Sequence, residues 1–188
     1  MLRHASRLSD CLCDGNSSVS PTIARVPFDD VLSANAGYAD RFSLGGLAAS
    51  ARRGLAVVTC MDSRIEPLTM LGLRPGDAKI LRNGGARVTD DIVKTLVLAR
   101  YLLDVDRVMI VAHTDCRLAS GTEEELHAAL EAAGAPDSSA MHFGASPDQH
   151  ATLAADVAKL RAVEHLSGVE IGGFLYDVES GRVTPAAR

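Results

Sequence analysis

Two short apolar segments, each followed by side chains that commonly ligate metals, constrain the fold of this chain more than any other feature. Residues 55–59 lead directly into Cys60, and residues 107–112 lead into His113 and Cys116. Both segments are rich in β-branched residues, which is typical of strands covered on both faces of a parallel sheet. Parallel strands end at a common edge of an open α/β sheet, where such sheets bind their ligands. We therefore expect the two polar segments to meet at that edge.

Helical patterns alternate with the apolar segments and predict an α/β fold. A mostly parallel central sheet flanked by helices is the natural packing of this order, with an N-terminal helical arm and an edge strand near the C-terminus. The expected helices cover residues 28–42, 67–71, 89–103, 123–133 and 151–166. The expected strands cover residues 55–59, 78–81, 107–112 and 169–178, and residues 179–181 turn the last one into a short returning edge.

Length and composition indicate one globular domain that binds neither nucleic acid nor a membrane. Of the 188 residues, we assign 28–188 to a single domain and 1–27 to a flexible tail, whose Cys11 and Cys13 we interpret as incidental thiols. The net charge of −5 argues against a nucleic-acid partner. No segment approaches the ~20 apolar residues that span a bilayer. Free cysteines without a recognisable signal peptide favour a cytoplasmic location.

Cys60, His113 and Cys116 are the predicted metal ligands. Two thiolates and one imidazole form a soft nitrogen and sulfur set that suits Zn²⁺, and three protein ligands leave a fourth position open. A buried structural thiol is the alternative interpretation of Cys60 taken alone. The shared context of the three residues, at the ends of two buried-type strands, favours a metal site.

Asp62 and Arg64 are predicted to form a second functional pair beside Cys60. Residues two apart in an extended segment point the same way, and a guanidinium can hold a carboxylate in a fixed geometry. Next to a metal, Asp62 can take the fourth coordination position or accept a hydrogen bond from a metal-bound water while Arg64 holds it aside. For Asp115 we favour a helix cap over a hydrogen bond that orients a ligand.

Gly84 and Gly85 follow the second expected strand and are candidate substrate-binding residues. Without side chains they let the backbone approach a small substrate, although a tight turn explains them equally well. They are not a dinucleotide-binding motif, because the third glycine of that motif is absent.

These motifs together resemble those of the β-class carbonic anhydrases, over residues 28–181 and closest to the short bacterial members typical of actinobacteria. The segments that carry the resemblance are Cys60-x-Asp62-x-Arg64, His113-x-x-Cys116, Arg82-Asn83-Gly84-Gly85 and Thr89-Asp90-Asp91.

The resemblance implies a zinc enzyme, a carbonate dehydratase, in which a metal-bound hydroxide reversibly hydrates carbon dioxide to bicarbonate and a proton. Asp62 and Arg64 would be its catalytic dyad, with Asp62 becoming the fourth zinc ligand in a closed state. The resemblance also implies a homodimer or homotetramer, in which the helix at residues 28–42 packs on the neighbouring subunit.

One position departs from the family pattern: Arg117 stands where the family usually has glycine after the second cysteine ligand. A bulky cation there could fill the substrate pocket, pair with an acidic neighbour or stabilise the thiolate. Two alternatives to carbon dioxide hydration stay open, of which Arg117 motivates the second. One is a hydrolase of a similar molecule such as CS₂ or COS; the other is a weakly active or inactive zinc-binding regulatory protein.

Overall fold

The computed structural model describes residues 27–187, so the predicted tail with Cys11 and Cys13 lies, apart from residue 27, outside the described residues. The chain divides into two compact units, residues 1–43 and 44–188. The described part of the first unit contains helix α1 (Asp29–Ala39), which begins with two acidic residues and has no buried side chain. The second unit contains all the strands of the described residues and the candidate site.

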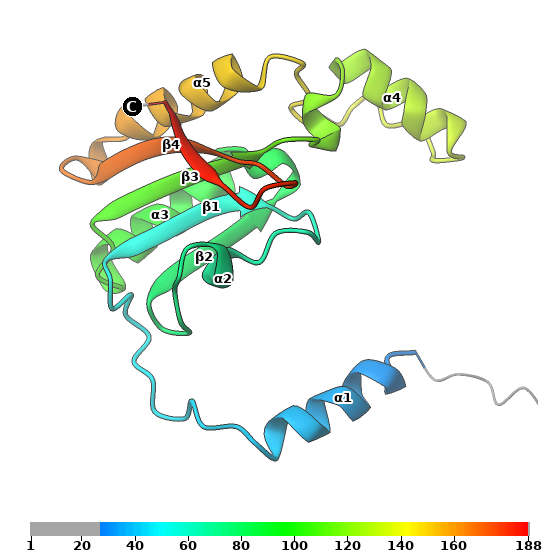
Figure 1. Ribbon diagram of the computed structural model, residues 1–188. Helices are drawn as coiled ribbons and strands as arrows, with labels where there is room; N and C mark the ends of the chain where they lie inside the picture. The colour runs from blue at the N-terminus through cyan, green and yellow to red at the C-terminus, as the bar shows by residue number, and fades with distance from the viewer. Residues whose placement is uncertain (1–26, 188) are drawn as a thin grey trace, which may run out of the picture. The chain divides into compact units, whose positions relative to one another are not determined.

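A five-stranded sheet forms the centre of the second unit, in the order β2-β1-β3-β4-β5. The first four strands are parallel and β5 is antiparallel to β4, which confirms the predicted mostly parallel sheet with a C-terminal edge strand (Figure 1). The apolar, β-branched segments at 55–59 and 107–112 form β1 and β3, the two strands that are almost wholly buried. The strands are β1 (Leu55–Cys60), β2 (Ala78–Asn83), β3 (Arg107–His113), β4 (Glu170–Tyr176) and β5 (Val183–Ala187).

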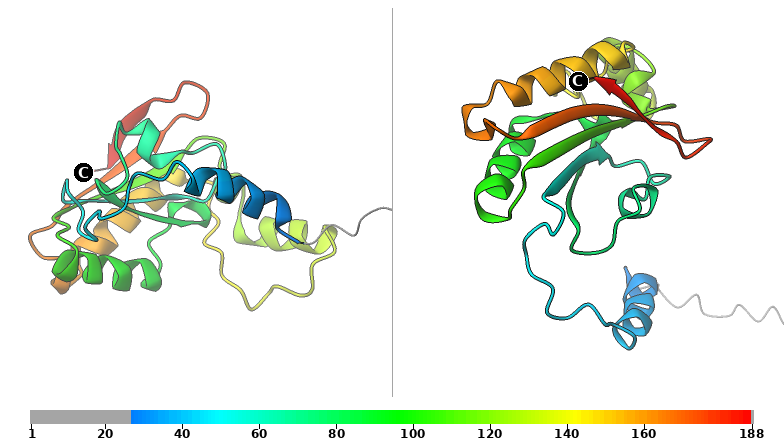
Figure 2. Two further views of the ribbon diagram at one scale, coloured as in Figure 1. Left: turned by 90° about the horizontal axis from the view of Figure 1, so that it is seen from below. Right: turned by 60° about the vertical axis from the view of Figure 1, so that its left-hand side comes forward.

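Helices α3 (Asp90–Leu102) and α5 (Gln149–Arg161) cover one face of this sheet. Leu96 and Leu160, both fully buried, pack in one cluster with alternate residues of β1 and β3, and Figure 2 shows the two helices on the same side of the sheet. Thr89 caps α3 by accepting a hydrogen bond from the Ile92 amide. Asp148 caps α5 in the same way, so this helix begins at Gln149, two residues before the predicted start.

The opposite face of the sheet carries the short helix α2 (Pro67–Met70). The side chains of β1 and β3 that point to this face, including Val57 and Val111, form a second apolar cluster with Leu68 and Met70 of the helix. Side chains therefore cover both faces of β1 and β3, as their continuous apolar sequences predict.

The remaining helix, α4 (Glu123–Ala132), buries none of its side chains. It begins with a capping box, in which the Thr122 hydroxyl accepts from the Glu125 amide and the Glu125 carboxylate accepts from the Thr122 amide. In Figure 1 it lies beyond the end of the sheet rather than on either face. Three short 3₁₀ helices complete the described elements: η1 (Gly84–Ala86), η2 (Arg117–Ala119) and η3 (Glu164–Leu166). Among the residues that the structure describes, no helix is both long and apolar enough to cross a bilayer.

Candidate metal centre

The carboxyl ends of β1 and β3 bring the three predicted ligands together. The two strands pair in parallel, and the buried Thr59 hydroxyl donates a hydrogen bond of 3.0 Å to the Val111 carbonyl at the point where both strands end. Cys60 follows Thr59, and His113 and Cys116 follow Val111. The two sulfur atoms and a ring nitrogen of His113 lie within 4.8 Å of one another, and all three side chains are buried.

His113 presents an unsatisfied nitrogen to this cluster. Its Nδ1 lies 2.8 Å from the Thr114 carbonyl, which assigns the ring proton to Nδ1 and leaves a lone pair on Nε2. Nε2 is buried and, among the described residues, has no hydrogen-bond partner. Gln149, at the start of α5, donates to the His113 carbonyl at 2.8 Å and holds the main chain of the ligand. A buried, unpaired lone pair is costly unless a ligand satisfies it.

Cys60 and Cys116 are free, buried cysteines, and a bound cation would stabilise their thiolates. Burial raises the pKa of the Cys116 thiol, against hydrogen bonds from the Leu118 and Ala119 amides, and the neighbouring Cys60 raises it further. A divalent cation reverses this balance, because it deprotonates the thiols that coordinate it. Zinc binds sulfur at about 2.3 Å and nitrogen at about 2.0–2.1 Å, and donor atoms that lie within 4.8 Å of one another are close enough for one ion to bind all three after a small adjustment. The donor set therefore fits zinc.

Asp62 and Arg64 form the predicted pair beside the cluster. The Asp62 carboxylate accepts three hydrogen bonds from Arg64: from the main-chain amide at 2.9 Å, from Nε at 3.0 Å and from Nη2 at 2.8 Å. These bonds hold the pKa of Asp62 well below its usual range and raise that of Arg64. Asp62 Oδ2 lies 4.0 Å from His113 Nε2, so an ionised carboxylate stands next to the unpaired nitrogen.

Asp115 corrects one expectation, because it does not cap the following helix. Cys116 occupies the N-cap position of η2, and no side chain provides a capping hydrogen bond there. Asp115 has a positive φ of 55°, so the chain reverses at this residue. Its carboxylate accepts from Arg64 Nη1 at 2.7 Å, and its carbonyl accepts from Nη2 at 3.1 Å. Asp115 thus holds the guanidinium that holds Asp62.

Arg82 is a further site residue, which the sequence reasoning did not assign. It stands opposite Thr59 on β2, the other neighbour of β1. Its Nε donates to the Cys60 carbonyl at 2.9 Å and its Nη2 donates to the Asp62 carbonyl at 2.7 Å. The sequence feature that could have indicated this role is the position of Arg82 near the end of the second strand, directly before Asn83 and the two glycines. Arg82 fixes the main chain that carries both a predicted ligand and the predicted acid–base residue.

The predicted substrate-binding pair forms a tight turn against the metal cluster. The Gly85 amide donates to Cys60 Sγ at 3.3 Å, and Gly85 has a φ of +74°. A Cβ atom on Gly85 would lie 3.3 Å from Leu118 Cβ, and one on Gly84 would lie 3.5 Å from Leu118 Cδ1. Absence of side chains here lets the turn approach both Leu118 and the sulfur; contact with a substrate stays a prediction.

Arg117 does not point into the space beside the ligands. Its side chain is exposed and lines a separate hollow of about 260 Å³ with Thr122 and Glu125 at the start of α4. A smaller cavity beside Cys116 is lined by Gly85, Arg87 and Gln149 among others, and Arg117 does not belong to its lining.

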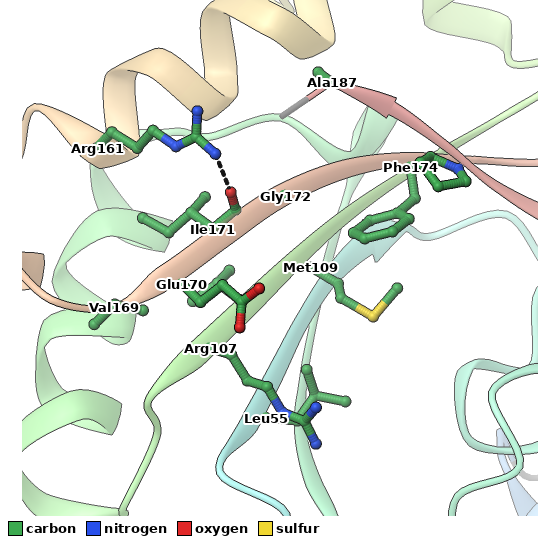
Figure 3. A pocket seen from close by; sticks show the side chains of 12 residues that line it. Leu55, Arg107, Met109, Arg161, Val169, Glu170, Ile171, Gly172, Phe174 and Ala187 are labelled. Carbon is green, nitrogen blue, oxygen red and sulfur yellow. Dashed lines mark hydrogen bonds between the residues drawn. The ribbon is translucent and has the colours of Figure 1, made fainter.

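A wide hollow lies at the other end of the strands. It measures about 690 Å³ and includes the first residues of three parallel strands, Leu55, Arg107 and Glu170. Figure 3 shows these side chains together with Phe174 and Met109, and also Arg161 donating to the Ile171 carbonyl. Neither a thiol nor a histidine lines it, and the three predicted metal ligands lie at the opposite, carboxyl ends of the strands.

Comparison with known proteins identifies the family of this chain. Residues 55–139, which include every predicted site residue, match the family model described as carbonic anhydrase. Beta-carbonic anhydrase 1 of Mycobacterium tuberculosis is 32% identical over 168 residues, which cover 84% of this chain and 98% of that protein. The crystal structure of carbonic anhydrase from Streptococcus mutans superposes with a TM-score of 0.80 at 34% identity, covering 87% of this chain and 99% of the other.

The chain therefore belongs to the β-carbonic anhydrase family, and its enzyme class is that of the carbonate dehydratase lyases. A carbon disulfide hydrolase of Acidianus sp. is also similar, with 40% identity over 74 residues that cover 39% of this chain and 36% of that enzyme.

Proposed function

We propose that this protein catalyses the reversible hydration of carbon dioxide to bicarbonate and a proton, with zinc held by Cys60, His113 and Cys116. Two observations carry the proposal: a ring nitrogen of His113 lies within 4.8 Å of two buried cysteine sulfurs, and the buried Nε2 of the same ring has no hydrogen-bond partner among the described residues. A zinc ion held there would act as a Lewis acid that lowers the pKa of water from about 15.7 towards 7 and so supplies the nucleophile.

Asp62 is the proposed acceptor of a hydrogen bond from the attacking water or hydroxide, which it would orient. Its carboxylate stays ionised because Arg64 donates three hydrogen bonds to it, and it lies 4.0 Å from the proposed ligand nitrogen of His113. An ionised carboxylate at this place can fix the direction of a water hydrogen and leave the oxygen lone pair free to attack. Asp115 holds Arg64, so the orientation of Asp62 rests on a chain of charged hydrogen bonds.

Arg64 would also control whether Asp62 is in the open state, outside the metal site, or in the closed state, as a fourth ligand. While Arg64 binds the carboxylate, Asp62 is kept outside the group of three ligands, which corresponds to the open state. Release of the carboxylate from Arg64 would free Asp62 to become a fourth ligand and close the site. The described arrangement, with all three Arg64–Asp62 hydrogen bonds formed, supports the open state.

Hydrolysis of carbon disulfide is the second candidate, favoured by the similarity to the Acidianus enzyme. The same three ligands would serve both reactions, so the metal cluster does not distinguish them. Longer and more polarisable CS₂ differs from CO₂ mainly in the room it needs beside the metal. Initial rates with CO₂ and CS₂ as alternative substrates of one zinc-loaded preparation separate the two: a CO₂ rate far above the CS₂ rate supports the proposal.

The proposed assembly is a homodimer or homotetramer in the cytoplasm. On α1, Val31 and Leu32 are 58% and 64% exposed, and exposed apolar side chains on one short helix favour packing against another chain. We propose that this helix lies on a neighbouring subunit. Sedimentation of the full chain and of a Val31→Ser/Leu32→Ser variant tests this, since the variant is expected to dissociate towards monomer.

Replacement of one ligand tests the proposed metal site. Cys60→Ser is expected to lose bound zinc and CO₂ hydration together, because a neutral hydroxyl is a poor zinc ligand. Ser63→Ala, an exposed position three residues on, is the matched control and is expected to retain both. Zinc content by mass spectrometry and hydration by stopped-flow indicator assay provide the two readouts. A Cys60→Ser protein with full zinc and full activity would contradict the proposal.

A further inference from the structure

The turn that touches the Cys60 sulfur has an unfavourable backbone conformation. Gly85 and Ala86 have consecutive positive φ angles of 74° and 59°, and Ala86 is buried. Glycine adopts this region readily, whereas alanine does so only where the surrounding structure holds it. The direction of the Gly85 amide therefore depends on whatever fixes the two ends of this turn.

Asn83 and Arg87 close the turn by binding each other. The Arg87 amide donates to Asn83 Oδ1 at 2.9 Å, and Asn83 Nδ2 donates to the Arg87 carbonyl at 2.7 Å. Residues 84–86 are thus enclosed in a ring of two hydrogen bonds. The position of this ring is set in turn by the Arg87 side chain.

Asp156, from helix α5, holds that side chain. Arg87 Nε donates to Asp156 Oδ2 at 2.8 Å, Arg87 Nη2 donates to Oδ1 at 3.4 Å, and the Val88 amide donates to Oδ2 at 3.3 Å. The third guanidinium nitrogen donates to the Gly144 carbonyl. Asp156 is only 5% exposed, the only carboxylate among the buried polar residues of the described chain. Burying a carboxylate is costly unless donors satisfy it, so these hydrogen bonds fix the position of the Asp156 carboxylate.

We propose that the Asp156–Arg87 pair is a positioning device that directs the Gly85 amide at the Cys60 sulfur. The inference rests on the proposed function in one respect, namely that Cys60 is a metal ligand. A hydrogen bond to a ligating thiolate withdraws charge from the sulfur and orients it, and such outer contacts commonly change metal affinity 10- to 100-fold. None of the hydrogen bonds of Asp156 and Arg87 goes to a proposed ligand, and although Arg87 lines the small cavity beside Cys116, the hydrogen bonds connect the pair to Cys60 through the turn.

Three variants separate this role from ordinary stabilisation. Asp156→Asn keeps the shape of the side chain and removes its charge. The double variant Arg87→Met/Asp156→Leu removes both charges, which commonly spares the stability that a single unpaired buried charge would lose. Val157→Ala removes a buried methyl pair from the neighbouring residue of the same helix and is the matched control for lost stability alone.

Cobalt(II) loaded in place of zinc provides the readout, because its sulfur-to-metal charge-transfer absorption reports the electron density on the ligating sulfurs. The pair variants are expected to shift this band to longer wavelength and to bind zinc about tenfold more weakly in a chelator competition. Val157→Ala is expected to change neither the absorption band nor the zinc affinity, even if it unfolds at a lower denaturant concentration than the double variant.

Three results overturn the inference, and they differ from one another. An unchanged band and unchanged zinc affinity in both pair variants would refute the positioning role while leaving the metal site intact. Equal shifts in Val157→Ala would reduce the role to general stability. Absence of any thiolate charge-transfer band in the unmodified protein would refute the proposed metal site itself, and the inference with it.

Discussion

Substitution of Gly85 by alanine tests the close approach of the turn to the metal cluster. The new Cβ would lie 3.3 Å from Leu118 Cβ, 3.4 Å from Leu118 Cδ2 and 3.5 Å from Arg87 Cγ. Gly85 also has a φ of +74°, where any L side chain is strained. The change therefore adds two costs, backbone strain and steric contact, at the residue whose amide donates to Cys60 Sγ.

Gly181 separates these two costs. It has a φ of +69°, and a Cβ atom added there would meet no heavy atom of the described residues within 4 Å. Left-handed backbone costs alanine about 1–2 kcal/mol, which is the whole expected effect of Gly181→Ala. Gly85→Ala is expected to lose about 2–4 kcal/mol, since the tight contacts with Leu118 add about 1–2 kcal/mol at the lower end of overpacking effects.

Urea unfolding at one fixed protein concentration measures both variants, with and without zinc. We expect Gly85→Ala to lose more stability than Gly181→Ala in zinc-free protein, and the difference to widen when zinc is added, because only Gly85 contacts a proposed ligand. Equal losses in the two variants under both conditions would refute the argument that the turn is packed against the metal cluster.

Three other substitutions test the site and its surroundings. Asp62→Asn is expected to retain zinc but to lose about 100-fold in CO₂ hydration rate, because the neutral amide loses the charged hydrogen bonds from Arg64 that fix its direction toward the water; wild-type turnover would contradict its role. Arg117→Gly is expected to change the rate less than about threefold, since the side chain lines a separate hollow; a large gain would show that Arg117 obstructs the site. Desolvation raises the pKa of Glu123, but hydrogen bonds from the Phe143 and Ala145 amides outweigh this and lower the pKa below the ordinary 4.5. The stabilising effect of Glu123 is therefore present above pH 4.5 and is lost as the pH falls through the lowered pKa. Glu123→Gln is expected to reduce the urea midpoint of unfolding at pH 7 and to leave it almost unchanged once the carboxyl is protonated. A reduction that does not vary with pH would contradict this assignment.

The sheet could be predicted because the signals for its central strands are local. Residues 55–59 and 108–112 are short, continuous apolar segments rich in β-branched residues, which are typical of a strand covered on both faces. Their order along the chain with intervening helices predicts parallel pairing, and the parallel pairing brings Cys60 and His113 together. The start of α5 was less predictable, because Asp148 caps this helix from within a polar loop that shows no helical period.

The hydrogen-bond network around the site could not be predicted from sequence, since its members come from distant segments. Arg64 binds Asp115, 51 residues away, and Arg87 binds Asp156, 69 residues away. Asp115 precedes a short helix, which favoured a capping role, but its positive φ turns the side chain to Arg64 instead. The positions of charged residues in the sequence show no periodic pattern that identifies a distant ion-pair partner. Asp156 lies beside Arg87 only because α5 packs on the sheet.

The metal content and ligand shell of the purified, reduced protein test the central claim most directly. Zinc analysis combined with zinc X-ray absorption is expected to find one zinc per chain, with two sulfur neighbours at about 2.3 Å and the remaining ligands nitrogen or oxygen at about 2.0–2.1 Å. A protein that binds no zinc stoichiometrically, or whose zinc has no sulfur neighbours, would contradict the assignment of Cys60, His113 and Cys116.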